Sequence, residues 1–117
     1  DRVVVGSDDI DAAKKVAGLY DRIDTQVFVM DAASAETVKY AANTYLAVRL
    51  SFVNSMAGVC EAAGADVQSV LQAVGADSRI GPAFLKPGPG WGGSCFPKDT
   101  AALVHTSRES GYRFRLL

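Results

Sequence analysis

The feature that most limits how this chain can fold is a run of about 30 residues, Ser34 to Ala63, that contains no proline. Its apolar and small side chains recur at intervals of three and four, which is the pattern of an amphipathic helix. One row of them comprises Ala41, Tyr45, Val48, Phe52, Ser55, Val59 and Ala62. A second, neighbouring row comprises Leu46, Leu50, Val53, Ala57 and Cys60. We expect a single helix about 45 Å long, with Ser34 as its N-cap, Glu36 in its first turn and Gly64 at its end.

Two apolar rows on one helix are more than a single neighbouring element can cover. The chain has 117 residues, which is enough for one domain with a modest core. We therefore expect a second copy of the chain to cover the row that the first copy leaves open. The sequence predicts a homodimer formed through the long helix, residues 34–63.

The segment before this helix has a different pattern. Residues 2–6 (RVVVG) and 26–30 (QVFVM) are rich in β-branched residues and predict two strands. Between them, apolar residues recur at helical spacing at Ile10, Ala13, Val16, Ala17 and Tyr20. Strand–helix–strand is the smallest piece of a parallel α/β sheet, and two strands do not form a stable sheet alone. The chain begins inside the first strand, without an initiator methionine or a signal peptide, so we expect it to be cut from a longer protein.

Three further segments follow the long helix. Asp66 is expected to cap a short helix over residues 67–74. Residues 77–94 contain too many glycines and prolines for regular structure, and they predict an ordered loop. A last helix is expected from about Pro97 to Ser110, since proline is tolerated in the first turn. The predicted fold class is mainly α, with an N-terminal strand–helix–strand unit.

Composition excludes several classes of protein. The formal net charge of −1 gives no electrostatic basis for binding nucleic acid or an anionic membrane surface. No run of about 18 apolar residues is present, so we expect no membrane span. The two cysteines, Cys60 and Cys95, form neither a disulfide framework nor a C-x-x-C motif, and no histidine cluster suggests a metal site. A cytoplasmic location is the expectation.

The stretch GPGWGGSCFPKD, residues 88–99, places a thiol where a loop becomes a helix. Unpaired backbone N–H groups and the helix dipole at that edge favour the thiolate of Cys95, and Lys98 adds a cation. Asp99 lies four residues after the thiol, where it is expected to face the same space and position a water. These are the parts of an activated nucleophile. The alternative is a structural cysteine packed behind a turn.

Other polar positions admit two interpretations. Lys39 and Asn43, four residues apart on one helix face, form either a solvated surface or a pair that holds an oxyanion. Arg79 and Lys86 are either solvated loop residues or anion ligands, and Phe84 is most simply an anchor for the loop. Other residues carry a structural expectation only: Cys60 packs inside the protein, and His105 is structural or exposed. Gly88, Gly90 and Gly93 match G-x-G-x-x-G literally, but Pro87 and Pro89 stand where a dinucleotide-binding fingerprint requires a strand.

The combination of motifs resembles the UDP-glucose/GDP-mannose dehydrogenase family. GPGWGGSCFPKD resembles its active-site signature, and ETVKYAANTYLAVRLSFVNSMAGVCEAAGADV resembles the start of its middle domain. DSRIGPAFLKPG resembles its substrate loop. The resemblance implies three parts: residues 1–33 as the end of an NAD-binding Rossmann-like domain, 34–111 as the helical central dimerisation domain, and 112–117 as the start of a linker to a UDP-binding domain.

The resemblance also implies roles for individual residues. Cys95 matches the nucleophile that captures an aldehyde as a thiohemiacetal and then carries a thioester, while two NAD⁺ each accept a hydride from the UDP-sugar. Lys39 and Asn43 match the pair around the reacting oxygen, and Asp99 matches an acid that handles water or protons. Lys98 and the backbone of residues 95–98, which includes Cys95, match the edge that contacts NAD. The implied substrate contacts are Lys39, Asn43, Arg79 (reaching a neighbouring subunit's substrate), Phe84 (near the uracil), Lys86, Gly88, Gly90, Trp91 and Gly92.

Two departures from the family pattern bear on function. Trp91 stands where the family more often has Phe, Tyr or Leu. The chain also lacks the glycine-rich NAD-binding turn and the Pro-Glu-Phe-Leu segment with its glutamate, so we expect it to be inactive by itself. The expected parent is an enzyme that oxidises UDP-glucose to UDP-glucuronate for polysaccharide biosynthesis. The alternatives are a GDP-mannose or UDP-N-acetylhexosamine dehydrogenase, or a purely structural dimerisation module.

Overall fold

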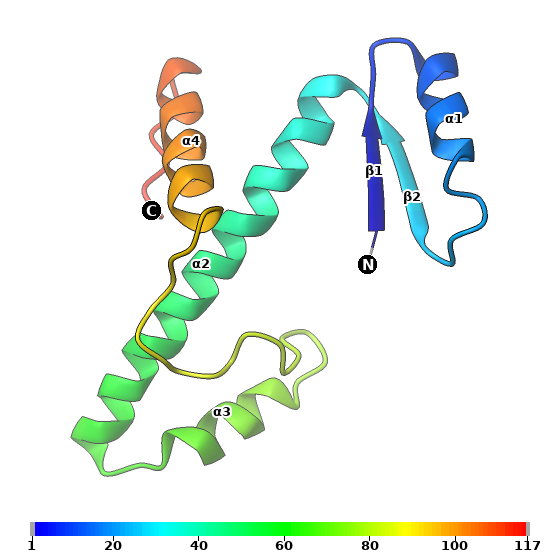
Figure 1. Cartoon of the computed structure of the whole chain (residues 1–117). Helices are drawn as coiled ribbons and strands as arrows, with labels where there is room; N and C mark the ends of the chain where they lie inside the picture. Colours follow the sequence, from blue (N-terminus) through cyan, green and yellow to red (C-terminus); the bar gives the residue numbers. More distant parts are fainter. Residues whose placement is uncertain (1, 117) are drawn as a thin grey trace. The chain divides into compact units, whose positions relative to one another are not determined.

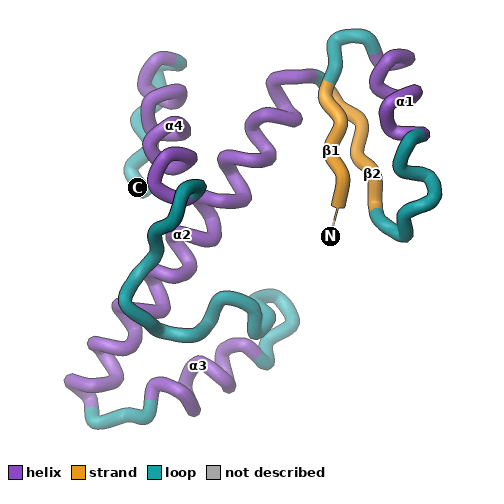
Figure 2. Tube along the Cα trace, in the orientation of Figure 1, coloured by secondary structure: helices purple, strands orange, loops and turns teal. Residues whose placement is uncertain are grey.

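A computed structural model of the chain describes residues 2–116 (Figures 1 and 2). Its elements are, in order, β1 (Arg2–Gly6), α1 (Ile10–Gly18), β2 (Gln26–Met30), α2 (Ala32–Ala63), α3 (Val67–Gly75) and α4 (Phe96–Glu109). The described chain is mainly helical with a two-stranded parallel sheet at its N-terminal end, which confirms the expected fold class. It divides into two compact units, Asp1–Ala41 and Ala42–Leu117.

The first unit is built around the parallel pair β1–β2, in which Val4 lies opposite Phe28. The connection between the strands is α1, and the carboxylate of Asp9 caps that helix by accepting two backbone N–H groups of its first turn, each at 3.0 Å. Ala13 is the buried residue of α1. Phe28 and Val29 point to opposite faces of the sheet and both remain exposed in this unit. Both predicted strands are confirmed over the predicted residues.

The long helix α2 begins two residues before the predicted N-cap, so the assignment of Ser34 as the cap is wrong. The Asp31 side chain accepts the Ser34 N–H at 2.8 Å, and the Asp31 carbonyl accepts the Ala35 N–H at 3.0 Å. Hydrogen bonds from the Ser34 side chain and amide lower the pKa of Asp31. An aspartate immediately before the run satisfies the free N–H groups, so Ser34 is already inside the helix. The helix ends before Gly64, which has a φ of 69°.

The core of the second unit lies between α2, α3 and the loop that follows α3. Val53, Leu71 and Leu85 form a cluster in which each side chain is at most 9% exposed. The second apolar row of α2 supplies this core, because Val53 and Cys60 are buried. From the first row, Tyr45, Phe52 and Val59 are 61%, 53% and 56% exposed, and we call these three residues the outer row.

The connection between α3 and α4 has two parts with different environments. We call residues 76–87 the anchored segment, because Leu85 enters the core and Gly75 lets the chain approach α3 closely. A Cβ at Gly75 would lie 3.1 Å from Leu85 Cδ1 and from Pro82 Cα. The interpretation of Phe84 as the anchor is wrong: it is half-exposed, with a φ of 57°, and its neighbour Leu85 is buried. We call residues 88–95 the glycine loop, and all of them are exposed.

Candidate functional site

Cys95 is the N-cap residue of α4 and is exposed. Its carbonyl oxygen accepts the Asp99 N–H at 2.9 Å, which begins the helix, while its side chain makes no capping hydrogen bond. The Ser94 hydroxyl lies 3.7 Å from Cys95 Sγ. The thiol therefore stands at the open N-terminal edge of a 14-residue helix, with solvent access. Cys60 is a buried thiol in α2, as the sequence predicts.

Asp99 lies in the first turn of α4 and is only 1% exposed. The Asn43 side-chain amide donates a hydrogen bond to Asp99 Oδ2 at 2.5 Å, and the Lys98 ammonium pairs with Asp99 Oδ1. Both oxygens of the Asp99 side chain therefore have a partner. Asn43, in the part of α2 that belongs to the second unit, thus holds the Asp99 side chain in the first turn of α4. Asp99 lies one helical turn after the exposed thiol.

Asn43 is buried, so the interpretation of this position as a solvated surface is wrong. Its partner is 56 residues away in the chain, a contact that helical spacing does not reveal. The oxyanion role that the sequence suggests for Asn43 stays a prediction. The hydrogen bond from its amide N–H to Asp99 fixes the orientation of the Asn43 carboxamide. Lys39 lies on α2 in the first unit and is exposed, and its role also stays a prediction.

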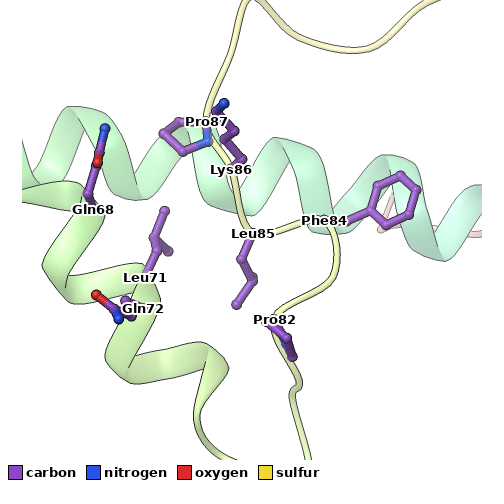
Figure 3. A pocket seen from close by; sticks show the side chains of 8 residues that line it. All are labelled: Gln68, Leu71, Gln72, Pro82, Phe84, Leu85, Lys86 and Pro87. Carbon is purple, nitrogen blue, oxygen red and sulfur yellow. The ribbon is translucent and has the colours of Figure 1, made fainter.

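A cavity of about 400 Å³ lies between α3 and the anchored segment (Figure 3). Phe84 and Lys86, two predicted substrate contacts, line it. Gln68 and Gln72 of α3 line it too, and sequence analysis did not identify them. Their spacing of four places both carboxamides on one face of a short helix, which is the signal that was available. An aromatic ring, an ammonium group and two amides can contact a polar ligand with a flat ring.

The glycine loop meets α2 through two side-chain hydrogen bonds. Asn54 Oδ1 accepts the Gly88 N–H at 2.9 Å, and the Ser51 hydroxyl accepts the Trp91 indole N–H at 3.1 Å. Trp91 also packs edge-on against Phe96, with 6.2 Å between ring centroids. The indole lines a second cavity of about 440 Å³ along α4.

The predicted contacts Gly88, Gly90 and Gly92 share one property: a Cβ at any of them would have no heavy atom within 4 Å. Gly90 needs its freedom for a φ of 118°, whereas Gly88 and Gly92 have no positive φ. The second unit therefore leaves open space beside the backbone at these two positions. His105 is exposed on α4 and lines the same cavity as Trp91.

Arg79 projects from the anchored segment with its side chain 87% exposed. Its guanidinium group donates to the Asp77 carboxylate from Nε and Nη2, the shortest of these distances being 2.6 Å. This pair raises the pKa of Arg79 and lowers the pKa of Asp77. Asp77 thus orients the Arg79 guanidinium group, whose contact with a neighbouring subunit's substrate stays a prediction.

Comparisons with known proteins agree with this arrangement. The model of the UDP-glucose/GDP-mannose dehydrogenase family, central domain, matches residues 33–117. UDP-glucose 6-dehydrogenase TuaD of Bacillus subtilis is 48% identical over 117 residues, which is 100% of this chain and 25% of the relative. A solved UDP-glucose dehydrogenase from the archaeon Pyrobaculum islandicum matches with a TM-score of 0.93 at 40% identity, over 99% of this chain and 27% of that one.

A second solved structure, an NDP-N-acetyl-D-galactosaminuronic acid dehydrogenase from Methanosarcina mazei, matches with a TM-score of 0.76 and 34% identity, over 92% of this chain and 23% of that one. The fold is thus that of the central domain of this family. The chain belongs to the UDP-glucose/GDP-mannose dehydrogenase family and comprises its central domain. It spans about a quarter of the length of these relatives. Within residues 2–116, no helix has the length and apolar character needed to cross a membrane.

Proposed function

We propose that this chain is the central domain of an NAD-dependent UDP-glucose 6-dehydrogenase, which oxidises UDP-glucose to UDP-glucuronate. The observation that carries the proposal is the exposed Cys95 at the N-terminal edge of α4, beside the buried carboxylate of Asp99. The names of relatives that are 40% to 48% identical over nearly the whole chain support the choice of substrate. The product is a sugar acid of the kind used in polysaccharide biosynthesis.

Cys95 acts as the nucleophile in the second half of the reaction. After the C6 hydroxymethyl group has lost a hydride and a proton, the sulfur adds to the aldehyde carbon and a C–S bond forms, giving a thiohemiacetal. Loss of a second hydride from that carbon, and of the proton from its hydroxyl group, gives a thioester. Water then attacks the carbonyl, the C–S bond breaks, and the acid leaves while the thiol is regenerated.

The residues around Cys95 fit a bound nicotinamide. All of the glycine loop is exposed, and a Cβ at Gly92 or Gly93 meets nothing within 4 Å, so a flat ring has room beside the sulfur. Lys98 and the backbone of residues 95–98 would hold the cofactor at this edge. When bound, NAD⁺ supplies the acceptor for the hydride.

The polar residues divide the remaining tasks. Asp99, which contacts the Asn43 amide and the Lys98 ammonium group, accepts a proton as water attacks the thioester. Asn43 and Lys39 stabilise the negative charge that develops on the oxygen bonded to C6, the amide through its second N–H group and the lysine through its charge. Substitution of Asp99 by Asn therefore slows hydrolysis of the thioester more than its formation.

The loop residues hold the nucleotide sugar. Lys86 contacts the diphosphate as a cation, and Phe84 stacks near the uracil, since both line the cavity on α3. The glycine loop, through Gly88, Gly90, Trp91 and Gly92, closes around the sugar. Arg79 reaches the substrate of a neighbouring subunit, with Asp77 orienting its guanidinium group.

A homodimer formed through α2 completes the proposal. The outer row repeats every seven residues and stays exposed in the single chain, as expected for a helix that packs against its twin. Phe52→Glu puts a charge in the centre of this row. We expect the variant to sediment as a smaller species than the wild-type enzyme, while Glu36→Gln, at an exposed position outside the row, keeps the wild-type mass. A Phe52→Glu enzyme of unchanged mass would contradict the interface.

The other parts of the protein follow from the same assignment. Residues 1–33 belong to an NAD-binding domain whose further strands cover Phe28 and Val29, and residues 112–117 lead toward a UDP-binding domain. Both described cysteines are free thiols, which fits a reducing, cytoplasmic location. The 117 residues alone do not turn over, because the hydride acceptor needs a domain of its own.

The test is turnover by the full-length enzyme that contains this chain. We expect NADH formation with UDP-glucose to exceed that with GDP-mannose or UDP-N-acetylhexosamines, two NADH to form per acid, and Cys95→Ser to lower kcat at least about a thousandfold. Cys60→Ser is the matched control and keeps its turnover. Preference for an acetylated sugar would favour the function named for the Methanosarcina mazei relative. Full activity of Cys95→Ser would leave the domain a structural dimerisation module.

A further inference from the structure

The glycine loop is not held in place by burial. Every residue from 88 to 95 is exposed, and four of these eight positions are glycine, which has the largest backbone freedom to lose. A loop of this kind samples many conformations unless hydrogen bonds restrict it. What fixes its conformation before a ligand arrives must therefore be sought in polar contacts.

Two side chains on α2 make such contacts. Asn54 Oδ1 accepts the Gly88 backbone N–H at 2.9 Å, and Ser51 Oγ accepts the Trp91 indole N–H at 3.1 Å. Ser51 and Asn54 are three residues apart and share one helix face. Their partners are also three residues apart, so the loop runs antiparallel to α2 between two fixed points.

We propose that Asn54 and Ser51 are positioning residues for the nucleotide sugar, acting through Gly88 and Trp91 without touching the substrate. This inference rests on the proposed function of the glycine loop. Asn54 sets where the loop begins, and Ser51 sets the orientation of the indole that lies over the sugar. A loop that is already in its bound conformation loses less entropy on binding, so the two contacts raise affinity for the sugar.

The contact between Ser51 and Trp91 depends on the residue type at position 91. The Trp indole has a ring N–H donor and the Phe ring has none, so the Ser51 bond is available to Trp91 and not to a phenylalanine at that position. The hydroxyl of Ser51 therefore acts with this particular indole. Loss of either group should have the same consequence as loss of both.

The test uses the full-length enzyme and steady-state kinetics with UDP-glucose and NAD⁺. We expect Asn54→Ala and Ser51→Ala each to raise KM for the sugar about three- to tenfold, the range of one exposed hydrogen bond. The kcat, the KM for NAD⁺ and the Tm stay near the wild-type values. Ser51→Thr, which keeps the hydroxyl, should have the wild-type KM for the sugar, unlike Ser51→Ala. Ser107→Ala is the matched control, because it removes a hydroxyl that donates to the Val104 carbonyl of its own helix.

A double-mutant cycle isolates the indole contact. In a Trp91→Phe enzyme, Ser51→Ala is expected to have no further effect on the sugar KM, whereas Asn54→Ala still raises it. The proposal is overturned if Asn54→Ala leaves the sugar KM unchanged, if Ser51→Ala has the same effect with Phe at 91, or if sugar and NAD⁺ KM rise together with a fall in Tm. A wild-type enzyme that oxidises no nucleotide sugar would instead refute the proposed function itself.

Discussion

The anchored segment and the glycine loop are consecutive stretches of one connection, and they are stabilised in opposite ways. The anchored segment inserts Leu85 between Val53 and Leu71, and the Arg49 guanidinium donates to the Gly81 carbonyl at 2.5 Å. The glycine loop has no buried residue, and it meets α2 through single hydrogen bonds at Gly88 and Trp91. The anchored segment is held by packing in the core. The glycine loop, which ends at Cys95, stays exposed to solvent.

This contrast shows how one connection serves two purposes. Burial of the Leu85 side chain fixes the position of its neighbours Phe84 and Lys86, which line the cavity beside α3, before any ligand binds. Open backbone beside Gly88 and Gly92 leaves space that a substrate can fill. Substitutions in the anchored segment should therefore change stability, while substitutions in the glycine loop should change binding and catalysis.

The largest expected effect on stability is that of Leu85→Ala. Removing a buried leucine side chain from a packed cluster leaves a cavity, and we expect a loss of about 2–3 kcal/mol in the free energy of unfolding. Ile80→Ala changes a more exposed residue of the same segment and should cost less than about 1 kcal/mol. Chemical denaturation of the full-length enzyme measures both. Equal losses would mean that Leu85 is not the anchor.

Alanine substitutions in the glycine loop should divide into two kinds. Gly90 and Gly93 have φ values of 118° and 82°, so Ala at either position costs about 1–2 kcal/mol of backbone strain. Gly88 and Gly92 have no positive φ and no close neighbour, so Ala leaves the Tm unchanged and raises the KM for UDP-glucose. Thermal melts and kinetics on all four variants test this. Similar losses of Tm at all four positions would remove the distinction.

The smallest expected effect concerns pH and the Asp77–Arg79 pair. Arg79 lowers the pKa of Asp77 below its ordinary 3.8, so this contact stabilises the segment above that pH and is lost as the pH falls through the lowered pKa. Because Arg79 is exposed and Asp77 is partly exposed, solvent screens the pair and the effect should be small. We expect the Tm of wild type and Asp77→Asn to differ slightly at pH 6 and to converge toward pH 3. Tm curves that stay parallel at every pH below 3.8 at which the protein stays folded would contradict the contact.

The regular elements of the chain were predictable because their patterns are local. The β-branched runs at residues 2–6 and 26–30 give strands, and the two apolar rows of α2 separate into a buried and an exposed face. The start of α2 was misplaced because Ser34 and Asp31 are both good capping residues, and the choice between them depends on backbone geometry.

The site was less predictable than the fold. The motif located Cys95 at the start of the last helix, since proline and glycine mark that boundary. The sequence did not predict that Leu85, rather than Phe84, is the buried residue. A loop has no regular period, so no pattern assigns a side chain to the buried or the exposed face. The bond between Asn43 and Asp99 joins residues on different helices, so it depends on tertiary packing that no local pattern encodes.

The most direct test of the account is the reactivity of Cys95 in the full-length enzyme. Iodoacetamide labelling, followed by mass spectrometry of the peptides that contain Cys95 and Cys60, gives the alkylation rate of each thiol. We predict that Cys95 reacts first at neutral pH, that activity falls in step with its modification, and that UDP-glucose slows both. Modification of Cys60 at the same rate, or full turnover after Cys95 is completely alkylated, would contradict the assignment of Cys95 as the nucleophile.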